Sequence, residues 1–181
     1  LNEHGILVKK NCNVTNVSEN GEHHIVSYTQ NNKDITVSAE HILFSNPLLN
    51  FIKFYKDTVP EKVVEAAGKL EYRNHISVHV TVDKKLFDDN WIYIHSPGLK
   101  MARIADFTNF SSEMSKLNEY PLTLEYFCFE DDDLWSEENS KIIEFGLKEL
   151  TSIFGNNFNV IHSAVTRNPN AYPVIKTGYE K

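Results

Sequence analysis

The feature that most constrains the fold is an alternation of apolar and polar side chains at residues 76–82. A β-strand turns successive side chains to opposite faces, so the alternation predicts a strand with one buried face and one polar face. Antiparallel sheets commonly have one face packed and one exposed. The apolar members are Ile76, Val78, Val80 and Val82, and the polar members are Ser77, His79 and Thr81.

A helix that covers such a sheet is predicted at residues 136–155. Ser136 is the expected N-cap, and Gly155 the expected end. Further strands are predicted at residues 91–94, 101–107, 122–129 and 160–166. The predicted apolar stripe of the helix is Ile143, Leu147, Leu150 and Phe154. The fold class is therefore α+β, a mixed, largely antiparallel sheet covered by helices.

A small β-meander is expected to precede this sheet. Asn20-Gly21 is a strong signal for a tight hairpin. Helices are expected after Pro47, placed at the first helical position, and after Pro60. Short β-prone runs lie at residues 6–8, 14–17, 25–28, 35–37 and 42–44, the last expected to be a buried strand. We predict two domains, residues 1–46 and residues 47–181.

Composition excludes several function classes. The 181 residues are 41% apolar and 24% charged, an ordinary balance for a folded protein. The formal net charge of -7 disfavours nucleic-acid binding, because that affinity comes largely from Lys and Arg at phosphates. The two cysteines have no spacing typical of a zinc site or a disulfide framework. No run approaches the roughly 20 apolar residues of a membrane span, so we expect a cytoplasmic protein.

Glycine is sparse, and this limits nucleotide binding. The chain has 7 glycines, against about 13 at an average usage of about 7%. No Gly-x-Gly-x-x-Gly and no P-loop occurs. Because such loops bring backbone N–H groups close to phosphates, we expect no nucleotide-binding loop within this chain.

Two groups of potential metal ligands have simpler explanations. His75 and His79 lie four residues apart on a strand, roughly 13 Å at about 3.3 Å per residue, too far to share an ion. The acidic residues 130–133 lack the ligand spacing of a calcium loop, so a solvated loop is expected. We predict no metal site.

Arg103 is the main candidate for function. It lies in an apolar strand, where an unpaired cation is costly. Asp106 would point to the opposite face, whereas Glu125 on a neighbouring strand is a possible partner. Two readings remain open, a structural ion pair or a guanidinium presented to a phosphate or carboxylate. Aromatic residues near these strands, Tyr126 and Tyr172 among them, suit a site for a ring-bearing ligand.

Both ends of the sequence suggest a longer protein. Residues 1–5 resemble the end of a helix capped by Gly5, and the chain stops shortly after the patterned residues 171–174. We therefore expect the sequence to be an internal piece.

Several segments carry a resemblance to a known family. They are residues 41–47, residues 103–111 (Arg-Ile-Ala-Asp-Phe-Thr-Asn-Phe-Ser), residues 124–126 and residues 171–174. Together and in this order, they resemble FAD-dependent flavoproteins of the UDP-galactopyranose mutase, amine oxidase and protoporphyrinogen oxidase group. The resemblance spans nearly the whole chain.

This resemblance implies a function. In the family, FAD binds to an N-terminal glycine-rich fold and a C-terminal segment, so we expect no FAD on these 181 residues alone and no activity of the isolated chain. Arg103 and Tyr172 are the implied substrate contacts, with Tyr126 behind them. The implied substrate is a nucleotide-sugar or another small molecule. The alternative is a self-contained, non-catalytic binding or interaction domain in which Arg103 is structural.

Overall fold

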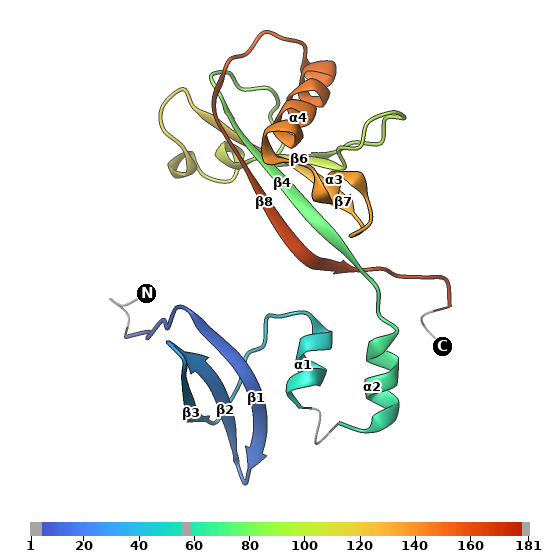
Figure 1. Cartoon of the computed structure of the whole chain (residues 1–181). Coiled ribbons are helices and arrows are strands. Elements are labelled where there is room, and N and C mark those ends of the chain that lie inside the picture. Colours follow the sequence, from blue (N-terminus) through green and yellow to red (C-terminus); the bar gives the residue numbers. More distant parts are fainter. Residues whose placement is uncertain (1–4, 56–58, 179–181) are drawn as a thin grey trace. The chain divides into compact units, whose positions relative to one another are not determined.

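The computed structural model describes residues 5–55 and 59–178. The chain forms two compact units, Leu1–Leu70 and Glu71–Lys181 (Figure 1). No helix in the described ranges has the length and apolar character that a membrane crossing needs. The helix end expected at residues 1–4 lies outside the described residues.

The first unit contains the predicted β-meander. Its antiparallel sheet has the order β1-β2-β3, made of Cys12–Asn20, His23–Gln30 and Lys33–Ala39. Gly21 has a φ of 63° in the first turn, as the hairpin signal predicts. The second turn uses Asn31 and Asn32, with φ angles of 51° and 58°. Asparagine tolerates this left-handed region, so both tight hairpins follow from local residue chemistry.

Two short runs of the first unit are not strands. Residues 6–8 and 42–44 lack strand structure, and Leu43 is fully exposed, so the expectation of a buried strand at 42–44 is wrong. A run of three apolar residues has strand composition, but a strand also needs a partner for its backbone groups. The helices after the two prolines are confirmed as α1 (Leu48–Phe54) and α2 (Glu61–Gly68). Pro47 is the N-cap of α1 rather than its first helical residue.

The second unit is built on a five-stranded antiparallel sheet with the order β5-β6-β7-β4-β8. The apolar side chains of the alternating segment in β4 are at most 1% exposed, so that prediction is confirmed. Short 3-10 turns η2 (Phe107–Asn109) and η3 (Ser112–Met114) follow β6. The strands are β4 (Tyr72–Val82), β5 (Trp91–Tyr93), β6 (Arg103–Asp106), β7 (Tyr120–Cys128) and β8 (Val160–Pro173).

The helical cover begins later than predicted. Residues 136–138 are not part of the main helix, because Ser136 ends the short helix α3 (Asp133–Ser136) and α4 spans Asn139–Phe154. The residue before α4 is Glu138, and its side chain makes no capping bond. Arg167 on β8 explains the break, since it donates to the backbone oxygens of Trp135 and Glu137.

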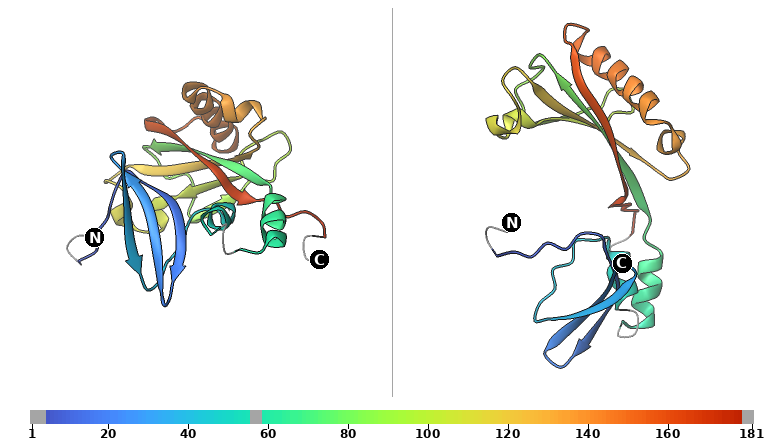
Figure 2. Two further views of the ribbon diagram at one scale, coloured as in Figure 1. Left: turned by 60° about the horizontal axis from the view of Figure 1, so that its bottom comes forward. Right: turned by 60° about the vertical axis from the view of Figure 1, so that its left-hand side comes forward.

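The buried line of α4 also differs from the predicted stripe. Its buried residues are Ile142, Gly146, Glu149 and Leu150. The other stripe residues, Ile143, Leu147 and Phe154, are partly buried against the same core. Figure 2 shows α4 along one face of the sheet in two further views. The fold class is thus confirmed as α+β.

Candidate functional site

The face of the second sheet opposite α4 carries a row of polar and aromatic residues. Cross-strand pairing places them directly beside one another on all five strands. Because directly paired residues lie on the same side of a sheet, their side chains are neighbours. The row, in strand order, is Tyr93, Arg103, Glu125, Ser77 and Thr166. We call the sheet face that carries this row the polar face.

A shared carboxylate lies in the middle of the polar face. Arg103 Nη2 is 2.5 Å from Glu125 Oε2, and His75 Nε2 is 3.2 Å from the same oxygen. The side chain of Glu125 is 9% exposed and that of Arg103 is 26% exposed. Glu125 is therefore the partner of Arg103, as the sequence allowed. Asp106 lies fully buried and instead binds Thr108, two residues along the chain.

The pKa values follow from these contacts. Burial alone would raise the pKa of Glu125, but hydrogen bonds from His75 and Arg103 outweigh it and lower that pKa. The hydrogen bond to Glu125 raises the pKa of Arg103 above its usual range. Both groups are thus held in their charged forms, and the pair has no net charge.

Aromatic rings border the charged pair on both sides. The guanidinium of Arg103 lies 5.7 Å from the ring centroid of Tyr93, a residue that is 60% exposed. On the other side, Tyr172 packs edge-on against Phe127 at 5.1 Å and approaches the His75 ring at 6.4 Å. Since His75 binds Glu125, one chain of contacts joins Tyr172 to Arg103.

His79 lies apart from that chain of contacts. Its two ring nitrogens each lie 3.0 Å from a threonine hydroxyl, on Thr123 and Thr166. Burial, with a smaller effect of His75, lowers the pKa of His79. Within the described ranges, no group of three or more His, Cys, Asp or Glu side chains is placed to hold a metal ion.

Tyr126 lies on the other side of the sheet. Its side chain is fully buried, and its ring lies 5.8 Å from that of Phe145 on α4. Burial, together with the nearby Glu149, raises its pKa strongly. Of the three candidate contacts, the structure brings together Arg103 and Tyr172 but not Tyr126.

Two residues of the polar face were not among the substrate contacts predicted from the sequence. Tyr93 is the direct cross-strand partner of Arg103, and His75 shares the carboxylate of Glu125. The alternation along the strand already places His75 on the same face as Ser77 and His79, but it does not predict the contact of His75 with Glu125. Tyr93 needs the strand register, which the sequence does not give.

The helix starts of the described chain are unsuited to a nucleotide phosphate. A phosphate loop places glycines before a helix N-terminus. Here the residues at those positions are Pro47, Pro60, Asp132 and Glu138. None of these four α-helix starts among the described residues has a glycine-rich loop, and the carboxylates of Asp132 and Glu138 would repel a phosphate.

Solved structures share this fold at low sequence identity. A protein from Exiguobacterium sp., provisionally named a protoporphyrinogen oxidase, has a TM-score of 0.63 at 12% identity, covering 91% of this chain and 36% of its own. An oxidoreductase from Methanosarcina mazei has a TM-score of 0.60 at 11% identity, with coverage of 87% and 37%. A reduced UDP-galactopyranose mutase has a TM-score of 0.59 at 16% identity, with coverage of 82% and 32%. The chain thus spans less than two fifths of the length of each of these structures.

Two comparisons of the sequence gave different results. No curated protein matches the chain significantly. The family profile described as flavin containing amine oxidoreductase matches residues 2–180, which is almost every position.

Proposed function

The chain belongs to the flavin-containing amine oxidoreductase family, and from that premise we propose that it forms the substrate-side part of an FAD-dependent oxidoreductase. The observation that carries the proposal is the polar face, where Arg103, Glu125 and His75 form one network. A charged side chain that is partly buried on a sheet costs free energy unless it is paired, so such groups commonly have a structural or a binding role. The polar face offers such groups beside exposed rings, which is the composition of a small-molecule site.

We propose that FAD is held by parts of the protein outside residues 1–181. The helix starts described above support this, since none has a glycine-rich loop. When bound, the flavin supplies the redox chemistry, and the protein supplies orientation and charge. In this proposal residues 1–46 belong to the cofactor side and residues 47–181 to the substrate side, in a cytoplasmic protein.

Each residue of the polar face has a distinct proposed role. Glu125 fixes the guanidinium of Arg103, which also donates from Nη1 to the hydroxyl of Tyr93 at 3.5 Å. In this proposal, the N–H groups that these two bonds do not use donate to a substrate oxygen. Tyr172 and Tyr93, which are 44% and 60% exposed, would contact an apolar or ring-shaped part of the substrate. Tyr126 has a packing role in this proposal, because its side chain is buried on the α4 side.

The charge of the pair bears on the substrate class. A nucleotide-sugar remains a candidate, with Arg103 at its diphosphate. However, Glu125 already neutralises Arg103, so the pair offers hydrogen-bond donors without net positive charge. This favours a neutral or singly charged group over a diphosphate.

A second candidate function is a self-contained binding domain without a cofactor. The short Arg103–Glu125 pair favours it, because the pair is a sufficient structural reason for a cation in this strand. The two candidates differ in what Arg103 does. In the second, replacing Arg103 lowers the melting temperature markedly and changes no ligand binding.

Amide NMR on the labelled chain tests the proposal, with UDP as a probe for a diphosphate and benzoate as a probe for a singly charged group on a ring. We expect at least one probe to shift amide signals around Arg103 and Tyr172. Tyr172→Ala should weaken that binding about tenfold, since it removes an exposed ring that lies outside the ion pair. Lys148→Met, on the exposed side of α4, is the matched control and should bind as the parent does. If neither probe binds, or if the shifts lie only on the α4 side, the proposed role of the polar face is wrong.

A further inference from the structure

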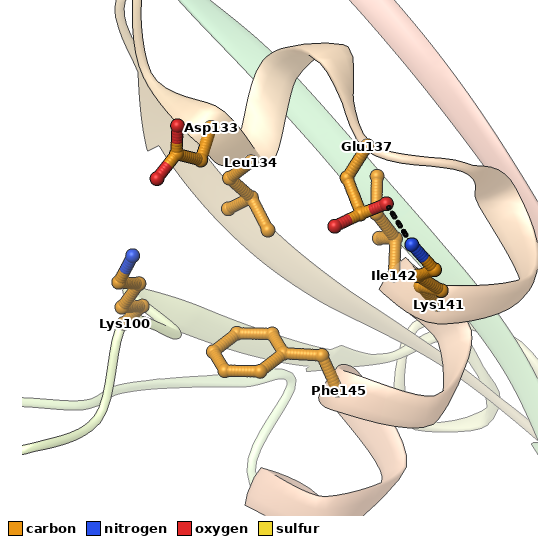
Figure 3. Close-up of a pocket in the computed structure, with 7 residues that line it drawn as sticks. All are labelled: Lys100, Asp133, Leu134, Glu137, Lys141, Ile142 and Phe145. Atoms are coloured by element: carbon orange, nitrogen blue, oxygen red, sulfur yellow. Dashed lines mark ion pairs between the residues drawn. The ribbon is translucent and has the colours of Figure 1, made fainter.

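A small pocket lies on the α4 side of the second sheet, away from the polar face (Figure 3). Its volume is about 180 Å³. Pockets for drug-sized ligands measure about 300–1,000 Å³, so this one suits a smaller molecule. The lining residues come from α3, from the link between α3 and α4, from the first two turns of α4 and from the segment before β6: Lys100, Asp133, Leu134, Glu137, Lys141, Ile142 and Phe145.

The pocket combines two opposite charges with an apolar floor. Glu137 and Lys141 form an ion pair at 3.1 Å and satisfy each other. Among the described residues, neither Lys100 nor Asp133 has an ion-pair partner. Figure 3 shows Lys100 and Asp133 on one side of the pocket, with the Phe145 ring beside them. Leu134 and Ile142 complete the apolar surface.

Both walls of the pocket are held by hydrogen bonds to side chains outside it. On one wall, the backbone N–H groups of Lys100 and Met101 donate to the carboxylate of Glu149, at 2.7 and 2.9 Å. Glu149 is 5% exposed and belongs to α4, so it ties the segment before β6 to the helix. On the other wall, Arg167 binds the backbone oxygens of Trp135 and Glu137, beside Asp133. Because the walls are already held in place, they lose less conformational entropy when a ligand binds.

We propose that this pocket binds a small zwitterion, namely a free α-amino acid with an apolar side chain. Its ammonium group would pair with Asp133 and its carboxylate with Lys100, while its side chain would lie against Phe145 and Leu134. A ligand with one charge can pair with only one of these two side chains, so a zwitterion makes one more charge-assisted contact. This site is independent of the polar face, and either proposal can fail without the other.

Three related ligands test the charge requirement on the full chain. L-Leucine carries both charged groups, 4-methylpentanoate lacks the ammonium group, and 3-methylbutylamine lacks the carboxylate. Followed by amide NMR, leucine should shift signals of α3, the start of α4 and Lys100. Both singly charged ligands should bind about tenfold more weakly, since each loses one charge-assisted contact. The proposal is overturned if leucine binds no more tightly than its two analogues, or if the amide signals that shift all lie outside the pocket.

Variants of the two exposed charges give an independent test. Lys100→Met should remove the advantage of leucine over 3-methylbutylamine, because only the carboxylate loses its partner. Asp133→Asn should remove the advantage of leucine over 4-methylpentanoate for the converse reason. Both side chains are exposed, so neither change is expected to unfold the chain. Lys148→Met, which lies outside the pocket, should bind leucine as the parent does. An equal loss of leucine affinity in all three variants would refute the pairing of Lys100 with the carboxylate and of Asp133 with the ammonium group.

Discussion

At the scale of single residues, the carboxylate of Glu125 organises the polar face. It accepts from both Arg103 and His75, and through His75 it connects to the ring of Tyr172. Its burial makes this arrangement energetically demanding, because a buried carboxylate needs charged or hydrogen-bonding partners. The polar face should therefore be sensitive to changes at Glu125.

Glu125→Gln should lower the free energy of unfolding by about 2 kcal/mol. The change leaves the guanidinium of Arg103 without its anionic partner, although 26% exposure of that side chain allows partial hydration. Urea denaturation near neutral pH measures the effect. Asp88→Asn, which removes the partner of Lys85 in an exposed ion pair, is the control and should change stability little. If Glu125→Gln lowers the free energy of unfolding no more than Asp88→Asn does, the Arg103–Glu125 pair adds no more stability than an exposed ion pair.

His79 should make stability depend on pH. Its pKa in the folded chain is lowered from 6.5, so the unfolded chain binds the proton more tightly. Stability is then complete above about pH 6.5 and falls as the pH drops through the lower folded pKa. His79→Gln should reduce the loss of stability between about pH 7.5 and about pH 5.5, measured by urea denaturation. An unchanged pH dependence in the variant would contradict this role.

The alternation of side chains along a strand predicts part of the polar face from the sequence. Arg103 in an apolar strand indicated a need for a partner, and Glu125 was available on a neighbouring strand. Tyr126 directly follows Glu125, so in a regular strand the two side chains point to opposite faces. Tyr126 is two residues from the buried Leu124, so the alternation along the strand puts both side chains on the buried face. The same alternation would have placed Tyr126 on the opposite face of the sheet from Glu125 and Arg103.

At the scale of elements, the contact between α4 and the sheet depends on Gly146. A Cβ atom at this position would lie 3.2 Å from Leu124 Cδ1 and 3.4 Å from Tyr126 Oη. Glycine weakens a helix, so its presence in the middle of α4 is explained by this close approach. Both neighbours belong to β7, and α4 therefore packs tightly on the buried face of the sheet.

Gly146→Val should destabilise the chain by about 1–3 kcal/mol, because the larger side chain overpacks this contact. Gly68→Ala at the end of α2 is the control, since a Cβ atom there meets nothing within 4 Å. Thermal denaturation of both variants measures the difference. A Gly146→Val variant as stable as the parent would mean that α4 can move away from β7 at little cost.

Helix boundaries were harder to predict than helix existence. The apolar spacing correctly indicated a helix ending at Gly155, but the break between α3 and α4 depends on Arg167, about 30 residues later in the chain. A contact over such a sequence distance leaves no local signal. The same holds for the row on the polar face, which exists only once the strand register is fixed.

At the scale of the whole molecule, the chain belongs to a flavoprotein family, and we propose that other parts of the protein hold the cofactor. The family profile covers residues 2–180, whereas the chain spans at most 37% of the solved structures compared above. The sequence leads to the same proposal, because short ordered motifs resemble the family while a glycine-rich loop is missing. The identity of the substrate had no comparable signal, since it depends on side chains that the fold brings together.

FAD content is the measurement that tests this account most directly. It compares the purified 181-residue chain with the longer natural protein that the proposal expects, by flavin absorbance after removal of free FAD. We predict that the natural protein retains FAD in a ratio of about one to one and that the isolated chain retains none, since none of the α-helix starts in its described residues has a glycine-rich loop. A natural protein that binds no flavin would contradict the central claim.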